Sequence, residues 1–205
     1  MDGVIVDSMP FHVRAWEVYL ERQGRDASTL NSRMHGKHND ELLRDVFGSE
    51  LNAEEIQRMG SEKEALYRDL IEGELEASLV PGVRQFLTRN LLMPKAVASN
   101  AEAANVDFVL DRAELASFFR FALNGQMVKY GKPHPEIYLK ASELLQIAPK
   151  DCIVFEDSQT GIDAAVAAGM RVVAINSHRT TLIGQAVEAD HFLDIRLQEW
   201  LQEQA

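Results

Sequence analysis

The sequence is poor in cysteine, and its single thiol, Cys152, excludes an internal disulfide. Such usage is typical of a reducing compartment. Because Cys152 opens an apolar run, we expect a buried and inert thiol rather than a nucleophile. The sequence also lacks an apolar stretch long enough to span a bilayer, and it has no basic-then-apolar signal at its start. These absences predict a cytoplasmic protein with no membrane partner.

Positive charge is scarce as well. The chain has 21 Lys and Arg residues against 32 Asp and Glu residues, which gives a formal net charge of -11. An acidic surface repels phosphate backbones, so we expect no nucleic-acid partner. No Gly-x-Gly-x-x-Gly follows an apolar run, which disfavours a nucleotide-dependent oxidoreductase. Since no interface stripe stands out either, we expect a monomer.

The apolar spacing divides the chain of 205 residues into two parts. Over residues 11–73 it is helical, and no strand is expected there. A helical pattern covers Asn39–Phe47, and Asn52 followed by Glu55 is typical of a capping box that opens the next helix. Residues 10–78 are therefore predicted to form an all-helical domain.

Beyond Pro81-Gly82, short continuous apolar runs alternate with helical segments. The expected strands are 96–98, 121–123, 153–155, 172–175 and 192–193, and the expected helices are 83–91, 101–110, 135–146 and 160–168. Strands separated by helices predict a parallel sheet with both faces covered. Residues 1–9 and 79–205 are thus predicted to form an α/β core.

Polar residues follow two of these strands, at the sheet edge where α/β proteins carry their chemistry. Glu156-Asp157 could hold Mg²⁺, or could be acids that favour a helix N-terminus. Ser99 could cap a helix that starts at Ala101, bind a phosphate, or do both. Lys132 could be a surface cation, or a charge aimed at a phosphate by its rigid Gly-Lys-Pro turn.

The chain carries four motifs in order: Asp2-Gly3-Val4-Ile5-Val6-Asp7-Ser8, Ser99-Asn100, Gly131-Lys132-Pro133 and Glu156-Asp157-Ser158. Together they resemble the four signatures of the haloacid dehalogenase superfamily. More closely, the chain resembles the β-phosphoglucomutase-like phosphatase branch, which inserts a helical cap after the first motif. The resemblance covers nearly the whole chain. It implies a Rossmannoid α/β core with an inserted all-helical cap and Mg²⁺-dependent phosphoryl transfer.

The resemblance also implies roles for the motif residues. Asp2 would be the general acid/base, and its backbone carbonyl would reach Mg²⁺ beside Glu156 and Asp157. Ser99 and Lys132 would bind the phosphate, and we expect Asn100 to contact the substrate. The family's nucleophilic aspartate would lie one position before Met1, at the end of a central strand. We expect such a strand upstream, and we expect residues 1–205 alone to be insoluble or inactive, because two neighbouring strands would lose their backbone partners.

Residues in the helical domain are candidates for substrate binding. These are His12, Gly36, His38 and Asn39. His12 could equally be a half-buried helix histidine, and His35 and His38 lack a third metal ligand nearby. In β-phosphoglucomutase proper, an arginine near the Asn39 position would grip a second phosphate. Asn39 cannot do so, although Lys37 or Arg44 could compensate.

This departure favours a phosphatase acting on a small phosphorylated metabolite, such as a sugar phosphate. Two alternatives stay open: a sugar-phosphate mutase of the same fold, and a non-catalytic binding protein that has kept Lys132, Glu156 and Asp157. Haloacid dehalogenation fits less well, because a lysine and paired metal-binding acids suit phosphate better than halide.

Overall fold

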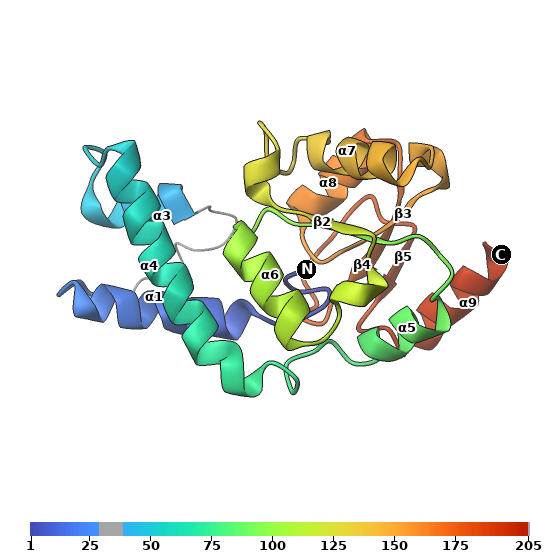
Figure 1. Cartoon of the computed structure of the whole chain (residues 1–205), viewed down its shortest axis with the longest axis horizontal. Helices are drawn as coiled ribbons and strands as arrows, with labels where there is room; N and C mark the ends of the chain where they lie inside the picture. Colours follow the sequence, from blue (N-terminus) through green and yellow to red (C-terminus); the bar gives the residue numbers. More distant parts are fainter. Residues whose placement is uncertain (29–38, 205) are drawn as a thin grey trace. The chain divides into compact units, whose positions relative to one another are not determined.

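The computed structural model describes residues 1–28 and 39–204. The chain divides into two compact units (Figure 1). The core unit comprises Met1–Asp7 and Leu75–Ala205, and the helical unit comprises Ser8–Glu74. No helix in the described ranges is long and apolar enough to cross a membrane.

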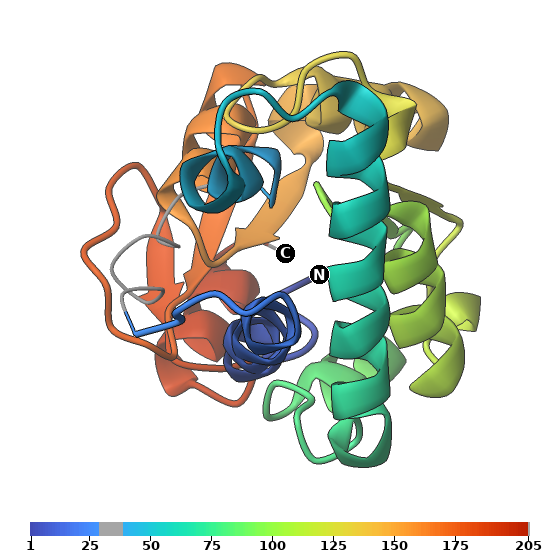
Figure 2. The same ribbon diagram turned by 90° about the vertical axis from the view of Figure 1, so that its left-hand side faces the viewer.

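The helical unit is built on its longest helix, α4. Helix α1 spans Met9–Arg22, α3 spans Asn39–Phe47, and α4 spans Ala53–Ile71, followed by the short η1 at Glu72–Glu74. Both α1 and α3 pack on α4. Figure 2 shows α4 along its length and α1 nearly end on, so these two helices cross at their contact. Apolar side chains at helical spacing line the contact, and their burial stabilises the unit.

The predicted capping box at the start of α4 is confirmed. Oδ1 of Asn52 accepts from the backbone N–H of Glu55, and a carboxylate oxygen of Glu55 accepts from the N–H of Asn52, both at 3.0 Å. Each bond satisfies a donor that the first turn of a helix leaves without an internal partner. A cap of this kind stabilises a helix by about 1 kcal/mol.

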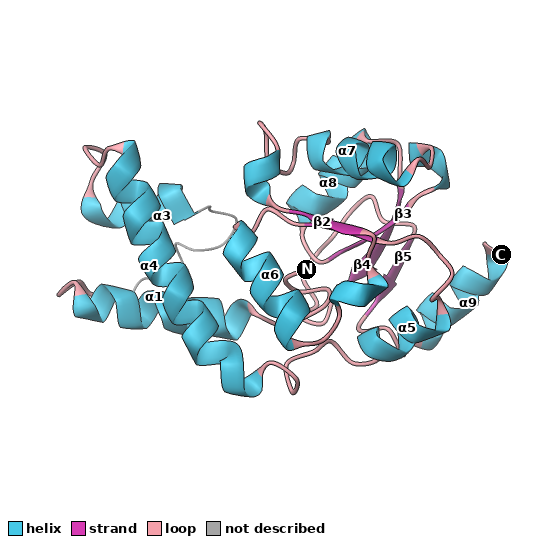
Figure 3. Ribbon diagram, in the orientation of Figure 1, coloured by secondary structure: helices cyan, strands magenta, loops and turns pink. Residues whose placement is uncertain are grey.

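All five described strands belong to the core unit, where Figure 3 shows them in magenta. Strands β1 (Ala96–Ala98) and β2 (Phe121–Leu123) form a parallel pair. Strands β3 (Ile153–Glu156), β4 (Arg171–Ile175) and β5 (Val187–Ala189) form a parallel sheet in that order. The predicted parallel α/β core is confirmed, although its strands form two hydrogen-bonded sheets.

Helices cover both faces of these strands. In chain order they are α5 (Val83–Arg89), α6 (Ala103–Arg112), α7 (Glu136–Leu145), α8 (Gln159–Ala167) and α9 (Ile195–Glu203), with short 3-10 turns η2 (Ala116–Phe118), η3 (Gly125–Met127) and η4 (Pro149–Asp151). Figure 1 shows α7 and α8 on one side of the strands, and α5 and α9 on the other. The expected layered arrangement is therefore present.

The two faces of β3 pack differently because successive side chains of a strand point in opposite directions. Val154 faces a cluster with small and branched residues of α8, among them Ile162 and Ala165, both 0% exposed. Phe155 faces the other side, where its ring lies 5.1 Å from that of Phe86 and 5.4 Å from that of Phe192. This aromatic cluster joins β3 to α5 and to the loop before α9.

Two sequence predictions for the core need correction. Residues 192–193 do not form a strand, because Phe192 places its ring in the aromatic cluster and the chain turns there. The fifth strand is β5, whose central Glu188 interrupts the apolar run that would have revealed it. The helix expected at 101–110 begins at Ala103 instead, since the hydroxyl of Ser99 accepts from the N–H of Ala101 at 3.1 Å and holds a turn there.

The N-terminal residues of the core unit form a tight turn rather than a regular strand. The N–H of Gly3 donates to the carbonyl of Val6 at 2.8 Å, and Val6 forms an isolated antiparallel bridge with Leu79. The N–H of Asp7 donates to the carbonyl of Ser78 at 2.8 Å. The two chain segments that lead into the helical unit therefore run side by side, joined by backbone hydrogen bonds.

Candidate active site

The loop that carries Lys132 is held by Asn100. The backbone N–H of Lys132 donates to Oδ1 of Asn100 at 3.1 Å. A side chain at Gly131 would press against the same amide, at 3.2 Å from its Nδ2. Asn100, which the sequence predicts to contact substrate, positions the loop in this structure. Two segments far apart in the sequence meet through this one side chain.

The ammonium of Lys132 lies between the ends of β1 and β3. Its Nζ donates to the carbonyl of Ala98 at 3.0 Å and to Oε1 of Glu156 at 2.5 Å. It also lies 4.8 Å from the centre of the Tyr138 ring, a cation–π distance. The residue is 9% exposed. Lys132 is therefore a buried, paired cation at the carboxyl edge of the strands and not a solvated surface charge.

Glu156 is the hub of this network. Its Oε1 also accepts a hydrogen bond from the hydroxyl of Tyr138, and its Oε2 accepts from the N–H of Asp157 at 3.2 Å. Burial raises the pKa of Glu156, but the Lys132 ammonium, the amino group of Met1 and the hydrogen bonds from Lys132 and Tyr138 outweigh burial and leave the pKa below its usual value. The carboxylate packs on Gly161 of α8, where a β-carbon would overlap it.

Asp157 has the opposite electrostatics. Burial, then the neighbouring charges of Glu156 and Asp2, raise its pKa to about 6, although the amino group of Met1 opposes the shift. Its carboxylate lies against the backbone of Gly3, which has a φ of +66° and no room for a side chain. Carboxylates of Asp2, Glu156 and Asp157 are thus close enough to repel one another.

A bound cation would relieve this repulsion between the carboxylates. In the described ranges, no three His, Cys, Asp or Glu side chains are arranged as a ready metal-binding group. Mg²⁺ does not need three, because it binds through one or two carboxylates and completes its octahedron with water and phosphate oxygens. The acids at Asp157 and Glu156, with the backbone of Asp2 beside them, therefore fit Mg²⁺.

Ser99 follows β1 and is 4% exposed. Its N–H donates to the carbonyl of Leu123 at 3.0 Å, which continues the β1–β2 ladder by one residue. Because its oxygen accepts from Ala101, its hydroxyl proton can be donated to an anion. Ser99 and Lys132 lie at the same edge of the strands, since Lys132 binds Ala98.

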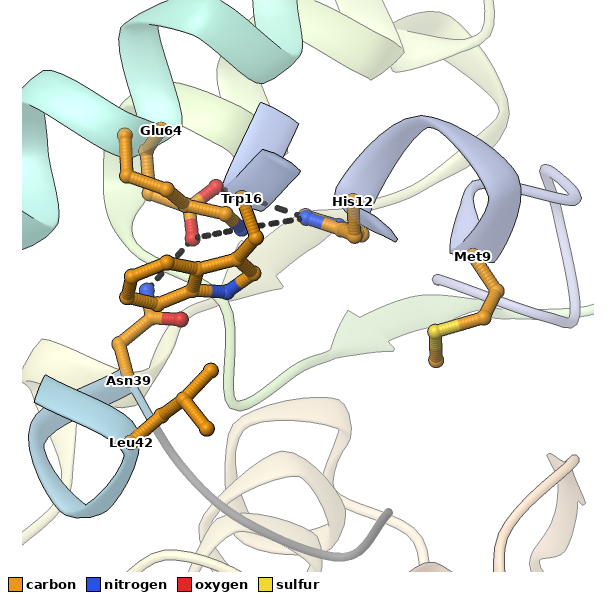
Figure 4. A pocket seen from close by; sticks show the side chains of 7 residues that line it. Met9, His12, Trp16, Asn39, Leu42 and Glu64 are labelled. Carbon is orange, nitrogen blue, oxygen red and sulfur yellow. Dashed lines mark hydrogen bonds and ion pairs between the residues drawn. The ribbon is translucent and has the colours of Figure 1, made fainter. Parts of the chain in front are cut away.

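The helical unit contains a cavity of about 150 Å³ (Figure 4). Its lining residues are Met9, His12, Trp16, Asn39, Leu42, Lys63 and Glu64. Two of the predicted substrate-binding residues, His12 and Asn39, are therefore brought together here. The other two, Gly36 and His38, lie outside the described residues.

A buried ion pair forms the polar side of this cavity. Nζ of Lys63 donates to Oε1 of Glu64 and to Nδ1 of His12, both at 2.9 Å. Since an ammonium only donates, Nδ1 of His12 accepts and its proton lies on Nε2. The His12 ring stacks on Tyr67 with centroids 3.9 Å apart, and Nδ2 of Asn39 donates to Glu64 at 2.6 Å. His12 is thus held in one orientation.

Arg44, a possible substitute for an arginine at position 39, is engaged elsewhere. Its guanidinium donates to the carbonyls of Ser49 at 3.0 Å and Leu51 at 2.9 Å. These bonds close the turn between α3 and α4. Lys37, the other possible substitute, lies outside the described residues.

Three residues of these networks were missed by sequence reasoning: Tyr138, Lys63 and Glu64. A signal for Lys63 exists, because it falls between Met59 and Tyr67 on the buried stripe of α4, where a charge needs a partner. Tyr138 lies on the apolar face of α7, and its hydroxyl also requires a buried acceptor there. Neither pattern indicates which residue is the partner of the buried Lys63 or Tyr138.

Comparison with known proteins identifies the family of this chain. A model of the haloacid dehalogenase-like hydrolases matches residues 1–169. The chain belongs to this family. A β-phosphoglucomutase of Bacillus subtilis is 28% identical over 215 residues, covering 98% of this chain and 93% of that protein. A phosphorylated carbohydrates phosphatase of Thermotoga maritima is 30% identical over 177 residues, covering 83% and 79%.

A solved structure of a haloacid dehalogenase hydrolase of family IA, variant 3, from Entamoeba histolytica superposes with a TM-score of 0.86. It is 26% identical to this chain and covers 98% of it and 95% of its own length. The chain is thus a haloacid dehalogenase-like hydrolase of the β-phosphoglucomutase-like branch. Its helical unit is the inserted cap of that branch.

Proposed function

We propose that the protein is a Mg²⁺-dependent phosphatase that hydrolyses small phosphate monoesters such as sugar phosphates. The observation that supports this most directly is the meeting of opposite charges at one edge of the strands. The Lys132 ammonium lies 2.5 Å from Oε1 of Glu156. Burial and the charges of Glu156 and Asp2 raise the pKa of Asp157 to about 6. A cation-binding acid group beside a buried lysine suits a substrate that is itself a phosphate anion.

In this proposal each residue has one task. Ser99 donates its hydroxyl proton to a phosphoryl oxygen, and Lys132 neutralises part of the phosphoryl charge. Asp2 gives a proton to the leaving-group oxygen as the ester P–O bond breaks, and it takes one from the water whose oxygen forms the new P–O bond. Glu156, Asp157 and the backbone carbonyl of Asp2 hold the metal. When bound, Mg²⁺ supplies further neutralisation of the phosphoryl oxygens.

The substrate class rests on the relatives and on the cavity of the helical unit. The Thermotoga maritima relative is named a phosphorylated carbohydrates phosphatase. In this chain, His12 and Asn39 line a cavity of about 150 Å³ that has both polar and apolar walls. Such walls suit a carbohydrate, which carries hydroxyl and C–H groups on one skeleton.

The test is release of inorganic phosphate by the purified protein. Fructose 1-phosphate and glucose 6-phosphate are supplied with Mg²⁺ and, separately, with excess chelator. We expect hydrolysis only with Mg²⁺, and losses of about 100-fold or more in Asp2→Asn and Lys132→Ala. Lys150→Ala, at an exposed lysine, is the matched control. A folded protein that releases phosphate from neither ester contradicts the proposal.

A sugar-phosphate mutase is the second candidate, and the Bacillus subtilis relative favours it. A mutase must hold a bisphosphate, yet the position expected to carry an arginine is Asn39, whose amide is bound to the Glu64 carboxylate. Interconversion of glucose 1-phosphate and glucose 6-phosphate that depends on the bisphosphate would decide for the mutase.

A further inference from the structure

The loop that carries Lys132 has little packing of its own. In the described loop 129–134 only Lys132 is buried, at 9% exposed, whereas Tyr130 is 50% exposed and the other loop residues are exposed as well. A loop with few buried apolar contacts is free to move unless polar contacts hold its backbone. The place of Lys132 therefore depends on the groups that bind this loop.

Glu136, the first residue of α7, binds the start of the loop. Its Oε1 accepts a hydrogen bond from the backbone N–H of Lys129 at 2.9 Å, and its Oε2 accepts one from the N–H of Tyr130 at 3.1 Å. Lys140 lies one turn further along the same face of α7, and its Nζ donates to the carbonyl of Met127 at 2.7 Å. Helix α7 thus holds the first half of the loop.

The Glu136 carboxylate is ionised in this setting. The hydrogen bonds from Lys129 and Tyr130 lower its pKa, with smaller contributions from His134 and Lys140, and together they outweigh desolvation, which raises it. Hydrogen bonds to an ionised acceptor are roughly twice as strong as those between neutral groups. The two bonds to Glu136 are therefore strong contacts for a loop that packing does not hold.

Asn100 binds the second half of the loop from the end of β1. Its Oδ1 accepts from the backbone N–H of Lys132 at 3.1 Å. The loop passes this amide so closely that a β-carbon at Gly131 would lie 3.2 Å from Nδ2. The loop is thus held on both sides of Gly131, by Glu136 before it and by Asn100 after it.

Lys132 needs this support because its ammonium ends a flexible four-carbon stem. Nζ donates to the carbonyl of Ala98 at 3.0 Å and to Oε1 of Glu156 at 2.5 Å. These bonds fix the direction of the ammonium only while the loop backbone stays in place. A displacement of about 1 Å at a group that positions a substrate costs roughly 100-fold in rate.

We propose that Glu136 and Asn100 are positioning residues that set the place of the Lys132 ammonium, and that they act on a bound phosphate only through Lys132. The inference rests on the proposed function, because it takes Lys132 as a ligand of the phosphate. It assigns the Asn100 side chain to the loop and not to the substrate. It also adds Glu136, which lies outside the four sequence motifs.

The test is a pair of double-mutant cycles with Lys132→Ala. Calorimetry measures the binding of inorganic phosphate in the presence of Mg²⁺, which requires no turnover. In the parent protein we expect Glu136→Ala to weaken phosphate binding about tenfold and Asn100→Ala about fivefold, as loss of a charged and of a neutral hydrogen bond implies. In the Lys132→Ala protein we expect both substitutions to leave phosphate binding unchanged. A residue that supports only the fold, or that contacts the phosphate itself, would weaken binding equally in both backgrounds.

Two variants serve as matched controls. Glu143→Ala removes an exposed acid from the same helix, and Asn90→Ala removes an amide that donates to the carbonyl of Phe86 at 2.8 Å at the end of α5. Both should bind phosphate as tightly as the parent. Because Glu136→Ala also removes a favourable charge from the first turn of α7, Glu136→Gln is measured as well. It keeps one acceptor oxygen, so we expect a smaller loss of about threefold.

The inference is overturned if the folded single variants bind phosphate as the parent does, if their losses are equal in both backgrounds, or if the folded parent binds no phosphate. Hydrolysis of fructose 1-phosphate is measured separately. Hydrolysis together with equal losses in both backgrounds removes the role of Glu136 and Asn100 and keeps the proposed function. Losses that depend on Lys132, in a protein that hydrolyses no ester, keep that role and remove the proposed function.

Discussion

The hydroxyl of Tyr138 donates to Oε1 of Glu156, the same oxygen that receives the Lys132 ammonium at 2.5 Å. The ring of Tyr138 also lies under that ammonium, 4.8 Å from it. One side chain thus orients both members of the buried ion pair. Tyr138 is 5% exposed and lies in α7, so the packing of this helix determines the geometry of the candidate site.

Tyr138→Phe removes the hydroxyl and keeps the ring. Glu156 then loses one of its hydrogen bonds, and we expect kcat/KM for fructose 1-phosphate to fall about tenfold, as loss of a hydrogen bond to a charged group implies. Because the ring remains, the thermal midpoint should change little. Tyr130→Phe, at a tyrosine that is 50% exposed, is the control. Unchanged kcat/KM in Tyr138→Phe would show that the hydroxyl has no positioning role.

Gly161→Ala places a β-carbon on the Glu156 carboxyl group. Replacing a glycine inside a helix by alanine normally raises the free energy of unfolding by about 1 kcal/mol. Here we expect the substitution to lower the free energy of unfolding by about 2 kcal/mol, because a buried and paired carboxylate cannot move aside freely. Chemical denaturation measures the change.

Gly60→Ala is the matched control for this substitution. Gly60 lies inside α4, and nothing lies within 4 Å of the position that its β-carbon would occupy. We expect it to stabilise the protein by about 1 kcal/mol. Equal effects at both positions would contradict the close packing of Glu156 on α8.

Magnesium should stabilise the folded protein through Asp157. At a concentration 100 times its dissociation constant, a ligand adds about 2.7 kcal/mol to the free energy of unfolding. We expect Mg²⁺ to raise the thermal midpoint of the parent and to have little effect on Asp157→Asn. Asp163→Asn, at an exposed acid of α8, should respond as the parent does. An equal Mg²⁺ response in Asp157→Asn would place the metal elsewhere.

Asp194 should make stability depend on pH at the acid end. It caps α9 by accepting from the N–H of Arg196 at 2.9 Å, and the Arg196 side chain with these hydrogen bonds holds its pKa well below the usual value. Since the folded pKa is the lower one, the stabilisation is present above pH ~4 and is lost as pH falls further. We expect Asp194→Ala to cost about 1 kcal/mol at pH 7.

The same substitution should cost progressively less between pH 5 and pH 3, because Asp194 of the unfolded parent binds a proton in this range while Asp194 of the folded parent stays ionised, and this difference favours unfolding of the parent. Urea denaturation of both proteins across this range measures the difference. Glu199→Ala, at an exposed acid of the same helix, controls for loss of a surface charge. A cost for Asp194→Ala that stays constant down to pH 3 would contradict the role of the ionised cap.

Local patterns predicted the elements whose apolar residues form a continuous run or a regular stripe in the sequence. The strands expected at 96–98 and 121–123 coincide with β1 and β2, and the helix expected at Asn39–Phe47 coincides with α3. These segments carry an uninterrupted apolar run or a regular apolar stripe, so their period is visible in the sequence. β5 was missed because Glu188 points its polar side chain to Asn176 and breaks the run. Phe192 was wrongly assigned to a strand because an aromatic side chain can also be buried when its residue lies in a loop.

Sequence alone determined the family and the order of the chemistry-bearing motifs, because each motif is a short local string at the end of a predicted strand. Only the tertiary structure decided which groups meet. Tyr138 reaches Glu156, Asn100 holds the backbone of Lys132, and Lys63 and Asn39 converge on Glu64. Most of these pairs are separated by many residues, and their contact depends on helix packing and strand register, which no local pattern encodes.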